Sequence, residues 1–134
     1  MLKALYPQIT IKNLSNSDDA AVMRLGIGLR EGKVDIHHAG TAMRFLTAFF
    51  ASQEGADVIL TGSNRMQERP IKILVNALKN LGAEIDYLGN EGYPPLRIKG
   101  RNLNEPKVSL PADVSSQYVS GLLLVAPRLE NGLE

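Results

Sequence analysis

The 134-residue sequence predicts an α/β chain (α+β by some schemes) that is built from βαβαββ units. Short β-rich runs alternate with helical patterns along most of its length. Segment 33–100 contains the complete order strand, helix, strand, helix, strand, strand. The flanking stretches 1–32 and 101–134 each contain a strand and a helix in that order, so we interpret them as incomplete units.

The amino-terminal stretch supplies the first elements. Residues 1–6 have the pattern of the end of a helix, which a proline then terminates. Residues 9–11, Ile-Thr-Ile, alternate as a strand does. Ser17, followed by Asp18 and Asp19, offers an N-cap and acidic residues for the first turn of a helix that runs to residue 27.

The central unit begins with a turn at 31–33 and a short strand at 34–36. A helix follows at 41–53, and its residues are apolar on nearly every side. Such a helix is typically buried within a protein.

The second half of the unit begins with a strand at 57–61. Pro70 fits the first position of a helix, and residues 71–81 show the clearest 3.6-residue apolar stripe in the chain. Two strands, 84–88 and 96–99, complete the unit.

After the central unit we expect a strand at 107–110 and a helix at 116–126. The first helix lacks a start and the chain stops after a turn. We therefore interpret the sequence as a fragment of a larger protein.

The composition narrows the range of functions. A net charge of +1 provides no overall field for nucleic acid or an anionic membrane. The sequence has no cysteine, which excludes disulfides, thiolate metal ligands and a thiol nucleophile in this chain. The apolar runs are too short to cross a bilayer. We expect a cytoplasmic protein whose partners include neither nucleic acid nor membrane.

A first candidate anion site lies at the start of the apolar helix. Gly40 allows close approach of a ligand, Thr41 is expected to cap the helix, and its free N–H groups favour an anion. Arg44 follows one turn into the helix. The alternative is that Gly40 only makes a turn and that Arg44 is a solvated side chain.

A second candidate anion site precedes the helix at 70–81. Arg65 and Arg69 are four residues apart, with Lys72 close behind. Cations at a helix N-terminus oppose the helix dipole, so an anion is expected to compensate them. The alternative is a solubilising surface in which Glu68 forms an ion pair with these arginines.

A third cluster, Ser115, Ser116 and Gln117, precedes the last helix and offers hydroxyl and amide donors to phosphate or sugar oxygens. Ordinary N-capping is its simpler interpretation. His37 and His38 point to opposite faces of an extended chain and lack a carboxylate at ligand spacing. We expect no metal site.

Together and in this order, these motifs resemble the enolpyruvyltransferases, most closely the EPSP synthase family. The matching stretches are 39–44 (AGTAMR), 60–71 (LTGSNRMQERPI), 93–96 (YPPL), 114–118 (VSSQY) and 17–19 (SDD).

The resemblance implies two domains, each an inside-out α/β barrel of βαβαββ units, with residues 1–134 forming most of the amino-terminal domain. It implies transfer of the enolpyruvyl group of phosphoenolpyruvate to the 5-hydroxyl of shikimate 3-phosphate, with release of phosphate and with no metal or organic cofactor. The other partner of this chain would be the carboxy-terminal domain of the same protein. We expect the full protein to be a monomer.

The resemblance also implies roles for individual residues. Gly40 resembles the family's backbone contact to phosphoenolpyruvate, and Arg65 resembles the arginine that holds its phosphate. The implied substrate-binding set is Gly40, Thr41, Arg65, Ser115, Ser116 and Gln117, with Arg44 and Arg69 in supporting positions. The family's Lys-Ser pair and the acid–base groups of its second domain are not in this sequence. We therefore expect no catalytic residue here and no turnover by this chain alone.

Two departures and two alternatives stay open. His38 stands where the family usually has Asn, and Phe45 stands where Pro is common; the segment 29–37 is also short. One alternative is the sister enzyme that acts on UDP-N-acetylglucosamine, which typically uses a mobile-loop cysteine that this chain lacks. The other is a non-catalytic anion-binding domain of the same fold.

Overall fold

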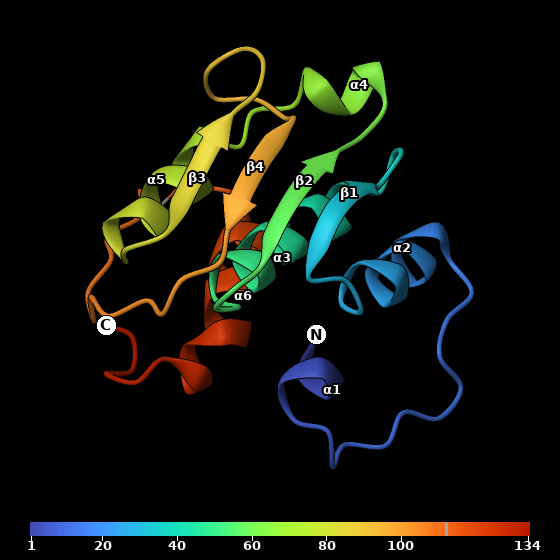
Figure 1. Ribbon diagram of the computed structural model, residues 1–134, viewed down its shortest axis with the longest axis horizontal. Coiled ribbons are helices and arrows are strands. Elements are labelled where there is room, and N and C mark those ends of the chain that lie inside the picture. Colours follow the sequence, from blue (N-terminus) through green and yellow to red (C-terminus); the bar gives the residue numbers. More distant parts are fainter. Residues whose placement is uncertain (112) are drawn as a thin grey trace.

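Four strands form one mixed sheet in the computed structural model, which describes residues 1–111 and 113–134 (Figure 1). They are β1 (Glu31–Asp35), β2 (Asp57–Thr61), β3 (Glu84–Tyr87) and β4 (Leu96–Lys99), in the order β1-β2-β4-β3. β1 and β2 are parallel, whereas β4 is antiparallel to both β2 and β3. The parallel pair needs a crossover, and the helix between β1 and β2 provides it.

Six α-helices accompany this sheet in the described residues, and the third and the fifth make the most contacts with its strands. They are α1 (Leu2–Leu5), α2 (Asp18–Gly26), α3 (Gly40–Ala51), α4 (Asn64–Gln67), α5 (Lys72–Asn80) and α6 (Ser116–Val125), followed by a short 3₁₀ turn (Ala126–Arg128). Figure 1 shows α3 and α6 behind the strands and α5 behind β3. None of the helices in the described residues has the length and apolar character to cross a membrane.

α3 is the centre of the core. Side chains on nearly all of its faces are buried, including Leu46 and Phe50, because the sheet, α2, α5 and α6 surround it. The buried helix predicted from its apolar sequence is confirmed. The sheet contributes alternate side chains to the same core, among them Val58 and Leu60 of β2.

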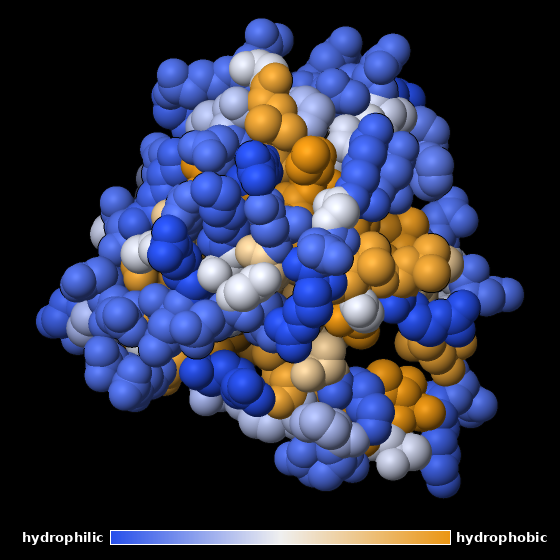
Figure 2. All heavy atoms as spheres, in the orientation of Figure 1, coloured by the Kyte–Doolittle hydropathy of each residue, from blue (hydrophilic) through white to orange (hydrophobic). Residues whose placement is uncertain are grey.

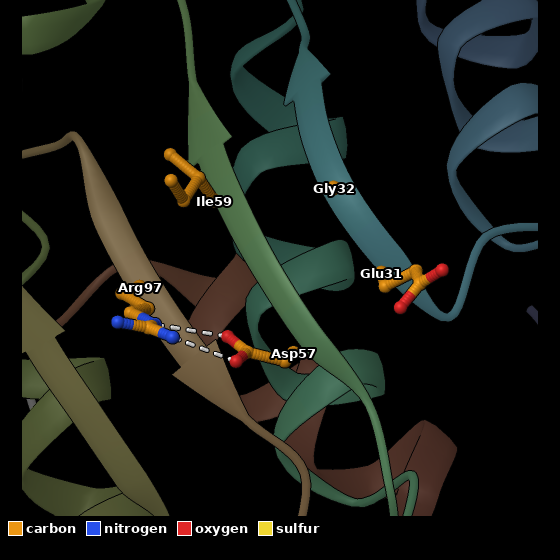
Figure 3. Close-up of a pocket in the computed structure, with 5 residues that line it drawn as sticks. All are labelled: Glu31, Gly32, Asp57, Ile59 and Arg97. Carbon is orange, nitrogen blue, oxygen red and sulfur yellow. Dashed lines mark hydrogen bonds and ion pairs between the residues drawn. The ribbon is translucent and has the colours of Figure 1, made fainter.

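The opposite face of the sheet is polar. Arg97 donates two hydrogen bonds to Asp57, at 2.9 and 2.8 Å (Figure 3). Lys99 lies 2.7 Å from Glu84, which also pairs with Arg101. Hydrophilic side chains cover much of the molecule seen from this side (Figure 2). The sheet thus has helices on one face and a charged surface on the other, and the predicted α/β class is confirmed.

Several predicted elements differ from the structure. Residues 9–11 and 107–110 are not strands, because a strand needs a neighbour for its backbone groups and neither segment has a ladder in the described chain. Val108 instead donates its N–H to the Glu134 carbonyl at 2.9 Å. The prediction of a turn at 31–33 is wrong, because β1 already begins at Glu31 and pairs with β2.

The second candidate anion site also differs in local structure from the sequence prediction. The short helix α4, capped by Ser63, was not predicted. α5 begins at Lys72 with Ile71 as its N-cap, so Pro70 precedes the helix and is not its first residue. The division of the chain into a complete unit at 33–100 and incomplete flanking units stays a prediction.

Candidate anion-binding site

The parallel strands β1 and β2 end at the same edge of the sheet, and the loops that follow them are hydrogen-bonded together. The N–H of Ile36 donates to Thr61 O at 2.9 Å, and the N–H of Ser63 donates to His37 O at 3.0 Å. A Cβ on Gly62 would lie 2.8 Å from His37 O, so only glycine permits this approach. This contact places the first two candidate anion sites, which were predicted around Gly40 and around Arg65, side by side.

The start of α3 is not capped as expected. Thr41 does not cap the helix, because it lies inside the first turn, whereas a capping residue has to precede the helix. The Ala42 N–H instead donates to Asp19 Oδ1 of α2 at 3.1 Å. One of the N–H groups expected to meet a ligand is therefore occupied by a carboxylate of the same chain.

Arg44 is buried at this helix start, with 6% of its surface exposed. Its Nη1 donates to Gly40 O at 2.9 Å, while its Nε is buried and has no partner among the described residues. Burial lowers the pKa of Arg44 and the charge of Arg69 lowers it further, while Tyr118 opposes both effects. Arginine nevertheless keeps its charge in proteins, so this site holds a buried, incompletely satisfied cation.

Arg69 lies against the same glycine. A Cβ on Gly40 would collide with Nη1 of Arg69 and lie 3.1 Å from Nη1 of Arg44. Gly40 thus leaves room for two guanidinium groups beside the first turn of α3. The interpretation of Arg44 as a solvated side chain is wrong.

Arg69 also lines a cavity of about 420 Å³, together with His38, Arg65 and Met66. Arg65 lies in α4 and Arg69 just after it, so both extend from the corner that follows β2. His38 comes from the loop after β1, and its Nδ1 lies 2.9 Å from Ser63 Oγ. The cavity therefore spans both loops and has cations on its wall.

The three arginines Arg44, Arg65 and Arg69 form no ion pair with a carboxylate in the described chain. Glu68 forms no ion pair among the residues that the structure describes, contrary to the alternative considered from the sequence. Lys72, by contrast, lies 2.6 Å from Glu91 and so does not contribute a free charge to this corner. Three like charges at one corner favour a bound anion.

The start of α6 reaches the same place. Gln117 Nε2 donates to Thr41 Oγ1 at 3.1 Å, and the Tyr118 hydroxyl donates to Pro70 O at 2.9 Å. Ser115 caps α6 by accepting from the Gln117 N–H at 3.4 Å, and Ser116 is exposed beside it. Two of the predicted residues, Gln117 and Thr41, are thus in direct contact although they are far apart in the sequence.

Sequence reasoning missed the contributions of Asp19, His38, Ser63 and Tyr118. Asp19 was interpreted only as a favourable acidic residue in the first turn of α2, so its contact with α3 was not predicted. Tyr118 directly follows the Ser-Ser-Gln motif, and this adjacency was the available signal. The partner of His38 lies 25 residues away, so no local pattern indicated it.

A larger hollow lies over the outer face of the sheet but has different chemistry. Its volume is about 670 Å³, and its lining residues are Glu31, Gly32, Asp57, Ile59 and Arg97 (Figure 3). The hydrogen bonds from Arg97 lower the pKa of Asp57, and the same pair raises the pKa of Arg97. Because these charges already satisfy each other, we assign the candidate site to the arginine-lined cavity.

Comparison with known proteins gives a consistent result. The family model for EPSP synthase (3-phosphoshikimate 1-carboxyvinyltransferase) matches residues 3–134. A 3-phosphoshikimate 1-carboxyvinyltransferase of Bacteroides fragilis (strain YCH46) is 53% identical over 124 residues, which cover 92% of this chain and 30% of that protein. A Mannheimia haemolytica protein with the same name is 50% identical over 72% of this chain and 23% of its own length.

A solved structure of EPSP synthase from Acinetobacter baumannii also resembles this fold. The two align with a TM-score of 0.63 and 31% sequence identity, over 71% of this chain and 21% of the other. This chain spans about 30% of the length of the Bacteroides fragilis relative, so it corresponds to a part of such a protein. By its motifs, its fold and these matches, the chain belongs to the EPSP synthase (3-phosphoshikimate 1-carboxyvinyltransferase) family.

Proposed function

We propose that the full-length protein containing this chain transfers the enolpyruvyl group of phosphoenolpyruvate to the 5-hydroxyl of shikimate 3-phosphate. The observation that carries this proposal is the gathering of Arg44, Arg65 and Arg69 at one edge of the sheet without a carboxylate partner in the described chain. Both proposed substrates are small acids that carry a phosphate and a carboxylate. Clustered guanidinium groups suit such ligands, because each one can form paired hydrogen bonds to an anion.

Within this proposal, the cavity wall binds phosphoenolpyruvate. Arg65 would hold the phosphate, and Gly40 would allow the ligand to approach the first turn of α3. Arg44 and Arg69, whose guanidinium groups both lie next to Gly40, would support this contact. The buried Nε of Arg44 supports this arrangement, since an anion nearby would offset the cost of burying the charge.

The start of α6 would bind shikimate 3-phosphate. Ser115 and Ser116 present hydroxyl groups there, and Gln117 presents a side-chain amide. The hydrogen bond from Gln117 to Thr41 places this group next to α3. The two proposed substrate subsites therefore adjoin, as a reaction between two bound substrates requires.

The chemistry needs groups that the cavity does not supply. In the proposed reaction the 5-hydroxyl group gives up its proton to a base and its oxygen bonds to C2 of phosphoenolpyruvate, while C3 gains a proton and the C2–C3 double bond becomes a single bond. Loss of phosphate and of a C3 proton then restores the double bond. No carboxylate lines the cavity among the described residues, and Asp19 is engaged by the Ala42 N–H. We assign the acid–base groups to the remainder of the full-length protein.

The test is a phosphate-release assay on the full-length protein with phosphoenolpyruvate and shikimate 3-phosphate. We expect turnover with this pair and none when UDP-N-acetylglucosamine replaces shikimate 3-phosphate. Turnover with the nucleotide sugar would favour the sister enzyme, which the names of the relatives do not support. Binding without turnover on either acceptor would favour a non-catalytic anion-binding domain.

A matched pair of variants locates the site. Arg65→Ala should remove a charge-assisted contact of about 1.5–3 kcal/mol and raise the KM for phosphoenolpyruvate at least tenfold. Arg97→Ala removes an arginine that is paired on the outer face of the sheet and should leave KM unchanged. Equal kinetics for both variants would contradict the proposed site.

Location and assembly belong to the same proposal. We propose a cytoplasmic enzyme, because both substrates are multiply charged and a charge is costly to transfer into an apolar phase. We also propose that the full-length protein is a monomer, with the remainder of its own chain closing the substrate site.

A further inference from the structure

His38 lines the arginine-rich cavity, and the proposed function does not yet use it. Its ring is fixed by one contact, the 2.9 Å hydrogen bond between Nδ1 and Ser63 Oγ. Ser63 is itself fixed, because its Oγ caps α4 by accepting from the Met66 N–H at 3.4 Å. The loop after β1 therefore holds an oriented imidazole beside Arg65 and Arg69.

The second ring nitrogen is available for a ligand. Nε2 has no hydrogen-bond partner among the described residues, while Nδ1 is occupied. A neutral imidazole that carries its proton on Nε2 can donate to an anion, and the serine hydroxyl then donates to Nδ1. Protonation of the ring reverses the bond to Ser63 and adds a full positive charge on the cavity wall.

Charged groups surround the loop on several sides. Arg65 and Arg69 line the cavity together with His38. On the other side, Asp18 of α2 and Asp35 of β1 share with His38 a second hollow of about 480 Å³. Asp35 also accepts the N–H of His37 at 2.8 Å. Asp19 of α2 accepts the Ala42 N–H at 3.1 Å.

A bound anion would change the charge next to the ring. An anion in the cavity would offset the two guanidinium groups, and this change favours the protonated ring. By linkage, a proton that is taken up on anion binding also makes that binding tighter at lower pH. Histidine is the side chain whose charge ordinarily changes between about pH 5 and 8.

We propose that His38 is an anion-binding residue of this cavity, oriented by Ser63, and that anion binding is coupled to proton uptake on its ring. The inference rests on the proposed function, since it assigns a further ligand group to the same site. The class of ligand is a dianion of phosphate type. An uncharged amide at this position would donate a hydrogen bond but would not titrate.

The test uses sulfate and the full-length protein. Sulfate stays a dianion across the working pH range, so any pH dependence of its binding belongs to the protein. At fixed ionic strength, calorimetry should show sulfate binding about three- to tenfold tighter at pH 6 than at pH 8. Titrations in two buffers with different ionisation enthalpies should show net proton uptake near pH 7.

Three variants separate His38 from other titrating groups. His38→Asn and His38→Gln should keep the fold, as checked by circular dichroism, and should lose most of the pH dependence and the proton uptake. His37→Asn is the matched control, because the neighbouring ring is 75% exposed and its polar contact is with Asp35 at 3.7 Å. It should behave like the unchanged protein. Ser63→Ala should weaken binding at both pH values, since the ring loses its orientation.

Two results would overturn the inference. One is a flat pH dependence in the unchanged protein, and the other is a full pH dependence in both His38 variants. Either result would leave the proposed function intact if Arg65→Ala weakened sulfate binding at least tenfold at both pH values. If Arg65→Ala bound sulfate normally, the proposed site itself would fail.

Discussion

Arg44 Nη1 donates to the carbonyl oxygen of Gly40 at 2.9 Å, one turn back along α3. This contact turns the guanidinium toward the first turn of its own helix, where the guanidinium of Arg69 also lies. The Nε of Arg44 is left buried without a partner in the described chain. A positive group is thus held at the positive end of a helix dipole, which is an unfavourable arrangement in the absence of an anion.

Arg44→Met should therefore separate stability from binding. Removing a buried, incompletely satisfied charge should leave the free energy of unfolding equal or raise it by up to about 2 kcal/mol. Affinity for phosphate should fall by roughly tenfold or more, because a charge beside the site is lost. Urea unfolding and calorimetric titration with phosphate measure the two effects. A loss of stability with unchanged affinity would show that Arg44 has only a structural role.

Gly40→Ala should impair binding by displacing Arg69. The new Cβ would occupy the space of the Arg69 guanidinium, and the flexible end of that side chain would have to move. We expect the KM for phosphoenolpyruvate in the full-length protein to rise about tenfold. Gly28→Ala is a suitable control, since its Cβ would meet nothing closer than Leu25 O at 3.6 Å. Unchanged kinetics for Gly40→Ala would contradict the close approach of Arg69.

The outer face of the sheet should make stability depend on pH. Hydrogen bonds from Lys99 and Arg101 lower the pKa of Glu84 from 4.5 to about 2. Because the folded pKa is depressed, this stabilisation is fully present above the unfolded value near pH 4.5 and is lost as the pH falls toward 2.

Glu84→Gln should test this dependence. The variant should unfold at lower urea concentration than the unchanged chain at pH 7, and the difference should shrink between about pH 5 and pH 2. Circular dichroism during urea titration at several pH values measures it. A difference that stays constant down to pH 2 would show that the carboxylate charge of Glu84 does not contribute.

The 134-residue chain alone should show no turnover. Among the described residues the cavity wall carries two arginines and His38 but no carboxylate, and the proposed function assigns the acid–base groups to the remainder of the full-length protein. A steady-state phosphate-release assay with both substrates should give the background rate. Clear turnover by the isolated chain would mean that an acid–base group is present within it.

Local sequence patterns predicted the elements whose physics is local. The all-round apolar sequence of α3 indicated a buried helix, and the stripe at 71–81 indicated the buried side of α5. Ser17 was expected to cap α2, and its Oγ accepts the Ala20 N–H at 3.4 Å. Each of these features depends on groups within one or two turns, so their spacing in the sequence contains the necessary information.

Patterns that need a distant partner were less reliable. Residues 9–11 alternate like a strand, but alternation does not supply a neighbouring strand, and Ile11 is exposed instead. Thr41 is a residue type that often caps helices. In the structure, however, the N–H of Ala42 in the first turn of α3 donates to the carboxylate of Asp19 on α2. In both cases the tertiary environment, which the local sequence does not encode, decided the outcome.

The sequence by itself determined which residues could bind an anion, since it contains the glycine, the arginines and the hydroxyl groups at predicted loop-to-helix junctions. Only the tertiary structure decided which of them meet. The parallel pairing of β1 and β2 joins His38 to Ser63, and the packing of α6 on α3 joins Gln117 to Thr41. The physical reason is range: helix and turn preferences act over a few residues, whereas a site forms where burial of the core brings distant segments together.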